Sequence, residues 1–422
     1  MGTDDQSSEV RASVVIIGGG FAGAEAARRL GKKLDVTIVS SDNYLLFTPM
    51  LAEVASGDIE PRHIIAPLRQ LCPKARVVVG EVTDIDLEAL EVKVRLELGR
   101  DPVVLSADAI VVASGGVPST YGVSGVAEHG LTFKNMLDAL RIRRRVPALL
   151  EAAATTGDAR LLEVAVIGAG YSGVELAAGL MDFMVEARRR FYPEAPQPKV
   201  TLLDFGDRVA PMLPKRMSAK AAKALNKREV EVRLGVKVVE VVAEGAVLDD
   251  GSRFEAGTTI WTAGVRGGEL GAALPGDKKH DRVVVDENFR TEASGVYAMG
   301  DAAVVPDGRG GICPPTAQHA LRQGKYLGKH LPDLIGGRKV RRFKYRTKGQ
   351  LVSVGHRNAV GTAMRIPVSG FVGWFMWRSY YLLRLPTIAR KTRVAIDWFL
   401  DLVFAPDIAE MPSADLGPPP TE

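Results

Sequence analysis

The fold is decided by the stretch VVIIGGGFAG at residues 14–23, which is matched later by VAVIGAGYSG at residues 164–173. Each stretch begins with a short apolar, β-branched run that predicts a buried strand, turns at glycines, and continues into an alanine-rich helical segment. Glycines at such a turn let the backbone approach a pyrophosphate, and the helix N-terminus favours the anion. Two copies predict two dinucleotide-binding units, and two dinucleotides in one chain indicate electron transfer between them.

Length and composition exclude several classes of protein. The 422 residues are enough for two or three domains, and the apolar and charged fractions are those of a globular protein. Cys72 and Cys313 are far apart and form no Cys-x-x-Cys pair, which argues against a disulfide scaffold, a zinc site or a dithiol relay. No metal site is predicted, because the histidines lack ligand spacing and are interpreted as surface or packing residues: His63, His129, His280 and His356.

The N-terminus and the hydropathy pattern predict that the chain stays on the cytoplasmic side. Asp4, Asp5 and Glu9 stand where a signal peptide would be basic and then apolar. No apolar run approaches the roughly 20 residues that cross a bilayer. If the protein meets a membrane, we therefore expect it to lie on the cytoplasmic face as a peripheral protein.

A basic run between residues 338 and 348 contains seven lysines and arginines and no acidic residue. A solvated surface is one interpretation of this run. Attraction to anionic lipid head groups is the other, worth about 1 kcal/mol for each well-placed basic residue. Nucleic acid is a poorer interpretation, because no recognition motif accompanies the run.

Two further strands follow the first glycine stretch. Residues 36–39 predict a second strand, and Ser40 and Asp42 stand where an acidic group normally meets the adenosine ribose. Residues 108–112 predict a buried parallel strand that ends in the small turn of Ala113, Ser114 and Gly115. Gly300 and Asp301 follow another short strand, and a carboxylate there can accept hydrogen bonds from the ribityl chain of a flavin; capping of the next helix is the alternative role.

The second unit repeats this construction. Residues 199–203 predict a strand that ends at Asp204, whose carboxylate would accept hydrogen bonds from both ribose hydroxyls and repel a 2′-phosphate. This favours NADH over NADPH, although Arg208 is close enough to tolerate a phosphate. Residues 258–264 again run from a strand into a small turn, which contains Ala263 and Gly264.

With these motifs the chain resembles the type II NADH dehydrogenases over nearly its whole length. These are single-subunit, non-pumping NADH:quinone oxidoreductases of the two-dinucleotide-binding flavoprotein superfamily. Besides the glycine stretches, the resemblance rests on NYLLFTPML at residues 43–51, WTAG at 261–264 and PTAQHALRQG at 315–324. Ser40 departs from the family's acidic ribose residue, and His319 and Arg322 depart from its glutamine-rich motif.

The resemblance implies an α/β fold with two Rossmann-like domains and a C-terminal amphipathic segment that associates with a membrane. It implies an FAD domain at residues 11–125 and 285–335, an NADH domain at 155–275 and a membrane-associating region at 340–422. The implied FAD residues are Gly18, Gly20, Phe21, Ala22, Gly23, Ser40, Asp42, Thr48, Pro49, Ala113, Ser114, Gly115, Gly300, Asp301 and Ala317. The implied NADH residues are Gly168, Gly170, Tyr171, Ser172, Gly173, Asp204, Ala263 and Gly264.

Two residues are candidates for catalysis. Gln318 corresponds to a family glutamine near the flavin ring and the quinone, where a neutral amide donates to a quinone carbonyl; packing under the flavin is the alternative. Glu175 matches a family glutamate between the nicotinamide and the flavin. It indicates either nicotinamide positioning or proton supply, or else an ordinary acid of the first helical turn.

The C-terminal segment is aromatic, apolar and basic. Residues 370–386 contain Trp374 and Trp377, and residues 394–404 form a second apolar stretch. Such stripes more often form a core or a homodimer interface, but the arginines around this one are typical of an interfacial helix at an anionic lipid surface. A membrane quinone, either menaquinone or ubiquinone, would enter from that lipid.

The predicted function is therefore the FAD-dependent oxidation of NADH by a quinone, which is reduced, without proton pumping. Sulfide:quinone oxidoreductase is a rival prediction, but it needs several cysteines beside the flavin and only Cys313 lies near a suitable motif. A soluble NADH-dependent reductase of a ferredoxin-like protein and a non-catalytic redox sensor are two more candidate functions.

Overall fold

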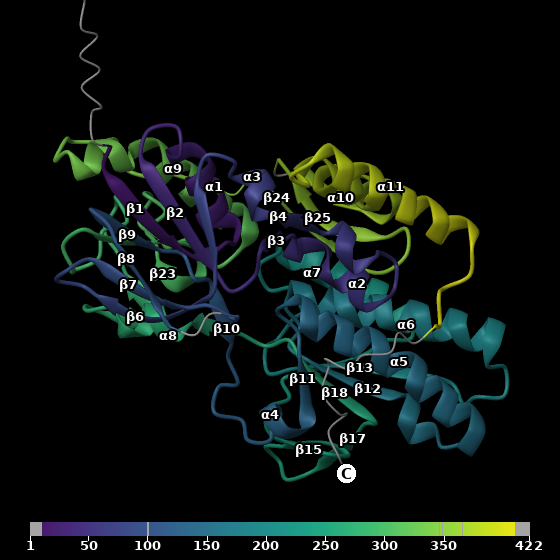
Figure 1. Ribbon diagram of the computed structural model, residues 1–422. Helices are drawn as coiled ribbons and strands as arrows, with labels where there is room; N and C mark the ends of the chain where they lie inside the picture. Colours follow the sequence, from purple (N-terminus) through teal and green to yellow (C-terminus); the bar gives the residue numbers. More distant parts are fainter. Residues whose placement is uncertain (1–10, 99–100, 346, 348, 365, 410–422) are drawn as a thin grey trace, which may run out of the picture. The chain divides into compact units, whose positions relative to one another are not determined.

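The computed structural model describes residues 11–98, 101–345, 347, 349–364 and 366–409. The chain forms two compact units (Figure 1). The first unit takes the described residues within 1–45, 66–117 and 265–346, and the second takes those within 46–65, 118–264 and 347–422. Each unit is therefore assembled from three segments that are distant in the sequence.

The first unit is built on a five-stranded sheet whose strands are all parallel. Its order is β22 (Val296–Ala298), β9 (Ala109–Val112), β1 (Ser13–Ile17), β2 (Asp35–Ser40) and β5 (Arg76–Val79). Strands that are covered on both faces are apolar throughout, as in β9, where all four residues are buried. Two smaller sheets belong to this unit, namely β6 (Glu81–Asp86), β7 (Glu91–Arg95) and β8 (Val103–Ser106), and β20 (Lys278–Lys279), β21 (Arg282–Val284) and β23 (Ala303–Val304).

The second unit repeats the parallel sheet. Its order is β11 (Gly130–Thr132), β18 (Thr258–Trp261), β12 (Glu163–Ile167), β13 (Lys199–Asp204) and β14 (Glu231–Leu234). The two sheets confirm the predicted α/β class. This unit also contains the antiparallel sheet of β15 (Val238–Val242), β16 (Gly245–Leu248) and β17 (Arg253–Glu255), and the helices α2 (Leu51–Ala55), α4 (Val126–His129), α5 (Met136–Thr156) and α7 (Lys215–Asn226).

A helix follows the glycine turn in each unit, as the sequence predicts. In the first unit α1 (Phe21–Leu30) follows β1, and in the second α6 (Tyr171–Phe191) follows β12. Helix α9 (Ala317–Ile335) packs along α1, and Figure 1 shows the two helices side by side. Gly324 makes this approach close, because a Cβ atom at that position would lie 2.2 Å from the carbonyl oxygen of Ala22.

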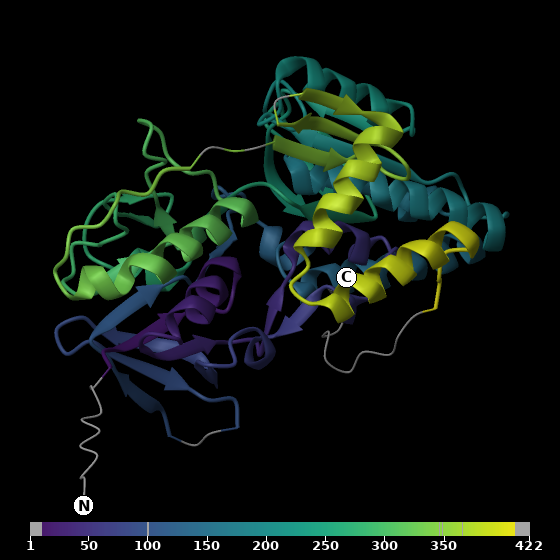
Figure 2. The same ribbon diagram turned by 90° about the horizontal axis from the view of Figure 1, so that it is seen from above.

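The C-terminal part of the second unit contains a sheet that the sequence did not reveal. Strands β24 (Gly349–Ser353), β25 (Ala359–Ala363) and β26 (Ile366–Ser369) form it, and α10 (Gly370–Arg384) packs on it (Figure 2). Helix α11 (Ile388–Val403) follows α10 and contains the second apolar stretch. Among the described residues, none of the helices has both the length and the apolar character needed to cross a membrane.

The close contact between α1 and α9 gives a test of this packing. We expect Gly324→Ala to lower the free energy of unfolding by about 1–3 kcal/mol, because the added methyl group collides with the backbone of Ala22. Urea unfolding followed by circular dichroism measures the change. The neighbouring Lys325 is exposed, so Lys325→Ala is the control and should change stability by less than about 0.5 kcal/mol. Equal stability of the two variants would contradict the packing.

Candidate dinucleotide sites and the cavity beside Glu175

The glycine turn of the first unit has two glycines at which a Cβ atom would collide with the backbone and one, called the open glycine, at which it would not. Gly18 has φ +112°, and a Cβ atom there would lie 2.2 Å from the carbonyl oxygen of Ala113. A Cβ atom at Gly23 would lie 1.9 Å from the carbonyl oxygen of Gly18, whereas one at Gly20 would meet no described atom within 4 Å. Gly20 also precedes α1 without a side-chain cap. The helix N-terminus therefore has both the space and the N–H groups that a pyrophosphate requires.

The second unit builds the same turn. Gly168 has φ +108°, and a Cβ atom there would lie 2.7 Å from the backbone nitrogen of Ala263. At Gly173 it would lie 1.9 Å from the carbonyl oxygen of Gly168, and at Gly170 it would again meet no described atom within 4 Å. Helix α6 likewise begins without a side-chain cap. Both glycine turns thus fit a dinucleotide, with the open glycine at the same place.

Residues from three distant segments surround the first turn. A Cβ atom at Gly300 would lie 3.5 Å from that of Ala22, and one at Gly116 would lie 3.2 Å from that of Asp301. The side chain of Gln323 is buried, and its Oε1 accepts a 2.7 Å hydrogen bond from the backbone nitrogen of Gly300. Gln323 therefore fixes the backbone next to Asp301, a role that we did not infer from the sequence although the residue lies in the PTAQHALRQG motif.

The implied FAD residues do not all belong to one unit. Thr48 and Pro49 lie in the second unit, whereas the others of that set belong to the first. Ser40 ends β2, as predicted, and Asp42 accepts a hydrogen bond from the hydroxyl of Tyr44. Phe21 begins α1, Ala317 begins α9, and Ser114 is exposed in the turn after β9.

Backbone groups at and near the glycine turn of the second unit hold the Asp204 carboxylate, which was predicted to bind the ribose hydroxyls. One carboxylate oxygen accepts a 2.5 Å hydrogen bond from the backbone nitrogen of Ala169, and the other accepts one of 2.6 Å from Gly206. Thr262 donates to the carbonyl oxygen of Gly168 at 2.8 Å. The Tyr171 hydroxyl is buried and has no hydrogen-bond partner among the described residues. A buried hydroxyl without a partner, next to the glycine turn, is consistent with a bound ligand that would form the missing hydrogen bond.

Gln318 lies at the start of α9 and is oriented by a tyrosine. The Tyr345 hydroxyl donates to Gln318 Oε1 at 3.1 Å, which leaves the amide nitrogen as the outward donor. His319 packs edge-on against the Tyr345 ring at 5.2 Å between centroids, and the Arg322 guanidinium stacks over that ring at 5.5 Å. The two departures from the family motif thus support the tyrosine. Tyr345 lies in the basic run, where no sequence signal separated it from its charged neighbours.

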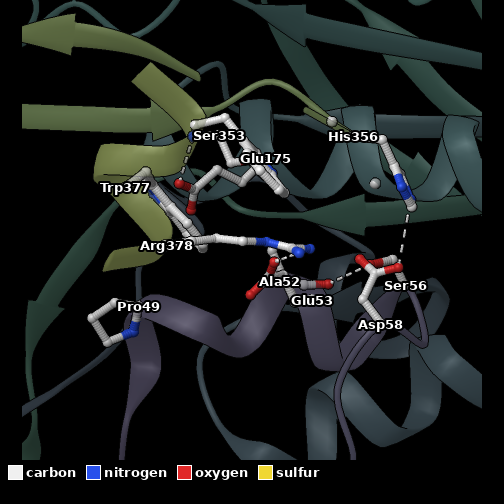
Figure 3. Close-up of a pocket in the computed structure, with 13 residues that line it drawn as sticks. Pro49, Ala52, Glu53, Ser56, Asp58, Glu175, Ser353, His356, Trp377 and Arg378 are labelled. Carbon is white, nitrogen blue, oxygen red and sulfur yellow. Dashed lines mark hydrogen bonds and ion pairs between the residues drawn. The ribbon is translucent and has the colours of Figure 1, made fainter. Parts of the chain in front are cut away.

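Glu175 points into a small cavity of the second unit (Figure 3). Its Oε1 accepts a 3.0 Å hydrogen bond from the backbone nitrogen of Ser353 in β24. Burial raises the pKa of this carboxyl to about 8, so that it is largely protonated at neutral pH. Ser172, on the first turn of the same helix, is exposed. Glu175 is therefore a neutral acid near pH 7 and not the exposed first-turn acid of the alternative interpretation.

Three more titratable groups line this cavity. Two of them were not singled out from the sequence, and His356 was interpreted there as a surface or packing residue. Glu53 lies on α2, Asp58 follows that helix, and His356 follows β24. Burial raises the pKa of Glu53 to about 8 and that of Asp58 to about 6. Asp58, His356 and Asp401 also offer ligand atoms within 4.8 Å of one another. Arg378 Nη2 lies 3.7 Å from Asp401, however. Its guanidinium already supplies the positive charge that a metal ion would otherwise provide to these acidic groups.

Comparison with known proteins decides the family. Residues 12–324 match the family described as pyridine nucleotide-disulphide oxidoreductase. The type II NADH:quinone oxidoreductase Ndh of Mycobacterium tuberculosis is 31% identical over 414 residues, which cover 92% of this chain and 87% of that protein. The chain belongs to the type II NADH:quinone oxidoreductases.

Two further proteins are similar to this chain over most of its length. A probable NADH dehydrogenase of Dictyostelium discoideum is 29% identical and covers 94% of this chain and 90% of its own. The solved structure of NDH2 from Plasmodium falciparum in complex with NADH superposes with a TM-score of 0.87, covering 94% of this chain and 100% of that one. At 20% identity, that similarity establishes the fold.

The buried acid at Glu175 makes stability depend on pH. In the unfolded chain a glutamate titrates near 4.5, whereas in the folded protein Glu175 holds its proton to about pH 8. Between these values the folded state binds more protons than the unfolded state, so stability falls as the pH rises. Glu175→Gln resembles the protonated acid. We expect the two proteins to be equally stable near pH 5 and the variant to be more stable by about 2–4 kcal/mol at pH 8.

Urea unfolding at the two pH values measures this difference. Glu60→Gln is the control, because the Glu60 side chain is 52% exposed on the same segment as α2. It should change stability little at either pH. Parallel pH dependences for wild type and Glu175→Gln would contradict the assignment of a neutral Glu175.

Proposed function

We propose that the chain binds FAD at the first glycine turn and NADH at the second, and passes two electrons from NADH to a membrane quinone. The observation that supports this most directly is the duplicated turn with one open glycine, Gly20 in one unit and Gly170 in the other. Two equivalent anion sites in one chain suit a protein that holds two dinucleotides together. Menaquinone and ubiquinone are both suitable acceptors.

NADH is proposed to bind with its pyrophosphate at Gly168, Gly170 and Gly173. Asp204 already accepts two backbone hydrogen bonds, which hold its carboxylate at the end of β13. Each carboxylate oxygen has a second lone pair for a ribose hydroxyl. A fixed negative charge there disfavours the 2′-phosphate of NADPH. Ser172, Ala263 and Gly264 complete this proposed site, with the Tyr171 hydroxyl as a further donor.

FAD supplies the redox chemistry when it is bound, because its ring accepts a hydride and later yields two electrons. The chain's part is to bind and orient it. Gly18, Gly20 and Gly23 would approach the pyrophosphate, and Asp301, next to the backbone that Gln323 fixes, would accept hydrogen bonds from the ribityl chain. Gln318, oriented by Tyr345, would donate to a quinone carbonyl without bringing a charge.

The cysteines argue against sulfide as the electron donor. Cys72 and Cys313 are both free and buried. Burial raises the pKa of Cys72 to about 11 and also raises that of Cys313. Neither cysteine is therefore a thiolate at neutral pH, and the thiolate is the form of cysteine that attacks sulfur.

Anaerobic flavin spectroscopy tests the proposed function. We expect NADH to bleach the oxidised flavin band and a short-chain quinone to restore it promptly. Bleaching without reoxidation would indicate another acceptor, such as a ferredoxin-like protein. Absence of bleaching would favour the redox sensor, and bleaching by sulfide would favour the sulfur enzyme.

Two matched variants test the cofactor assignment in the same assay. A Cβ atom at Gly20 or Gly170 meets no described atom within 4 Å, so an added methyl group there would contact only the proposed ligand. We expect Gly170→Ala to retain flavin but to slow bleaching at low NADH by about tenfold or more. Gly20→Ala should instead release flavin. The opposite pattern would reverse the assignment of the two turns.

We also propose that α10 and α11 bind an anionic lipid surface on the cytoplasmic face of the cell membrane. Large apolar side chains on these helices are exposed, including Phe371, Phe375, Leu383, Ile388 and Phe399, each by 60% or more. The basic run contributes less than its sequence suggested, because Arg338 pairs with Asp333 and Arg342 with Glu287. A homodimer interface is the alternative use of this apolar surface.

Sedimentation with anionic vesicles tests this lipid surface. We expect the triple variant Phe371→Ser, Phe375→Ser, Leu383→Ser to lose binding by at least tenfold, since apolar burial in the interface is removed. Phe205→Ser is the control, because Phe205 is 73% exposed but lies after β13. If the triple variant binds vesicles normally and a dimer dissociates instead, the homodimer interpretation holds.

A further inference from the structure

Four acid–base groups of the second unit border one cavity (Figure 3). The cavity has a volume of about 30 Å³, which is room for one or two water molecules. The side chain of His356 is 45% exposed, that of Asp58 is 17% exposed and that of Glu53 is 13% exposed. Together with Glu175 they therefore lead from solvent to the interior.

Two glycines bring these groups together. Gly179 lies one helical turn after Glu175, on the same face of α6, and a Cβ atom there would lie 3.0 Å from Ser56 Oγ. Its absence lets α2, which holds Glu53, approach α6. Gly355 has φ +84°, and a Cβ atom there would lie 2.3 Å from Asp182. The Asp182 carboxylate accepts a 2.6 Å hydrogen bond from the His356 backbone nitrogen, which fixes the turn.

The outer groups are His356 and Asp58, and one hydroxyl group holds the Asp58 carboxyl in place. His356 Nε2 lies 3.7 Å from Asp58 Oδ1, a distance that a small reorientation or one water molecule closes. Ser56 Oγ lies 2.8 Å from Asp58 Oδ2 and 3.0 Å from the carbonyl oxygen of Ala52. When Asp58 is protonated it can donate to Ser56, which then donates to that carbonyl. Ser56 therefore serves Asp58 in both of its protonation states.

The inner groups are Glu53 and Glu175, and the positive charge of Arg378 lies between Glu53 and the negative charge of Asp401. Arg378 on α10 lies 3.7 Å from both Glu53 Oε1 and Asp401 Oδ2, and Trp398 Nε1 on α11 donates to Glu53 Oε2 at 3.3 Å. Glu175 lines the same cavity from α6, where the Ser353 nitrogen contacts it. A water molecule in the cavity would have both carboxyl groups as partners.

The proposed reaction requires a proton from solvent in every turnover. NADH, one proton and a quinone give NAD⁺ and a quinol, in which two electrons and one proton come from NADH as hydride. The second proton of the quinol has to come from water. Protein groups that conduct a proton inward would supply it, and this inference rests on the proposed function.

We propose that His356, Asp58, Glu53 and Glu175, in that order, form a relay that carries this proton from solvent toward the quinone. His356 takes a proton at its exposed ring and passes it to the Asp58 carboxylate. The proton then moves through the cavity water to Glu53 and to Glu175. Each group is restored by the next proton from outside, so that the relay ends each turnover as it began.

The acidities of the three carboxyl groups suit this direction. Burial raises the pKa of Asp58 to about 6 and those of Glu53 and Glu175 to about 8. The proton affinity thus increases inward, and each of these carboxyl groups exchanges a proton within two pH units of neutrality. An unperturbed carboxyl, with a pKa near 4, would hold a proton too rarely at pH 7 to act as a donor.

Reoxidation of the reduced holoenzyme by two acceptors tests the relay. The enzyme is reduced anaerobically with NADH and mixed either with a short-chain quinone, which takes up protons, or with ferricyanide, which takes electrons alone. At pH 7 we expect Glu53→Gln to slow reoxidation by the quinone at least tenfold and reoxidation by ferricyanide by less than twofold. We also expect the quinone rate of wild type to decline above pH 8 and that of Glu53→Gln to lose this decline. Glu60→Gln, on the same segment, should match wild type.

Two further variants keep the test independent of Glu53. Asp58→Asn should show the same selective loss with quinone, and His356→Ala should show a smaller loss that added imidazole restores. Quinone rates equal to wild type in all three variants would overturn the relay, as would equal slowing with both acceptors, which indicates a structural role. If quinone fails to reoxidise wild type, the proposed function fails instead.

Discussion

The rest of the structure depends on one steric constraint, which is the close approach of backbone to backbone at the two glycine turns. At Gly23 and at Gly173 a Cβ atom would lie 1.9 Å from a carbonyl oxygen, a separation that no side chain tolerates. The strand before each turn and the helix after it are thereby packed so closely that the helix N-terminus faces the space beside the open glycine. A dinucleotide phosphate can bind there through backbone N–H groups alone, so the neighbouring side chains are free for selectivity and chemistry.

Because backbone atoms hold the phosphates, acidic side chains take other roles. Asp204 braces its own turn through two backbone hydrogen bonds, and Glu175, only one turn along α6, lines the cavity as a neutral acid. Burying three carboxyl groups around one small cavity costs stability at alkaline pH. Such a cost is typical of a functional site, and here it places proton donors next to a helix that begins at the proposed NADH site.

Much of the fold was predictable from the sequence, since the β-branched runs before Gly18 and Gly168 became β1 and β12 with nearly the predicted bounds. The family resemblance supplied Glu175 and Gln318. Their partners were not predictable. Tyr345 reaches Gln318 from a basic run. Glu53 and His356 line the same cavity as Glu175 but come from segments more than 100 residues away, with no local pattern that marks them. The sheet of β24, β25 and β26 was hidden for the same reason, because its strands are short and only partly buried.

Cofactor stoichiometry tests most directly the claim that the two turns hold two different dinucleotides. The flavin released on denaturation is identified and counted by absorbance and mass, and NAD⁺ binding to the intact holoprotein is measured by equilibrium dialysis. We expect one FAD and one NAD⁺ site per chain. Two molecules of the same dinucleotide per chain, or a purified folded protein that retains no flavin and takes none up, would contradict the claim.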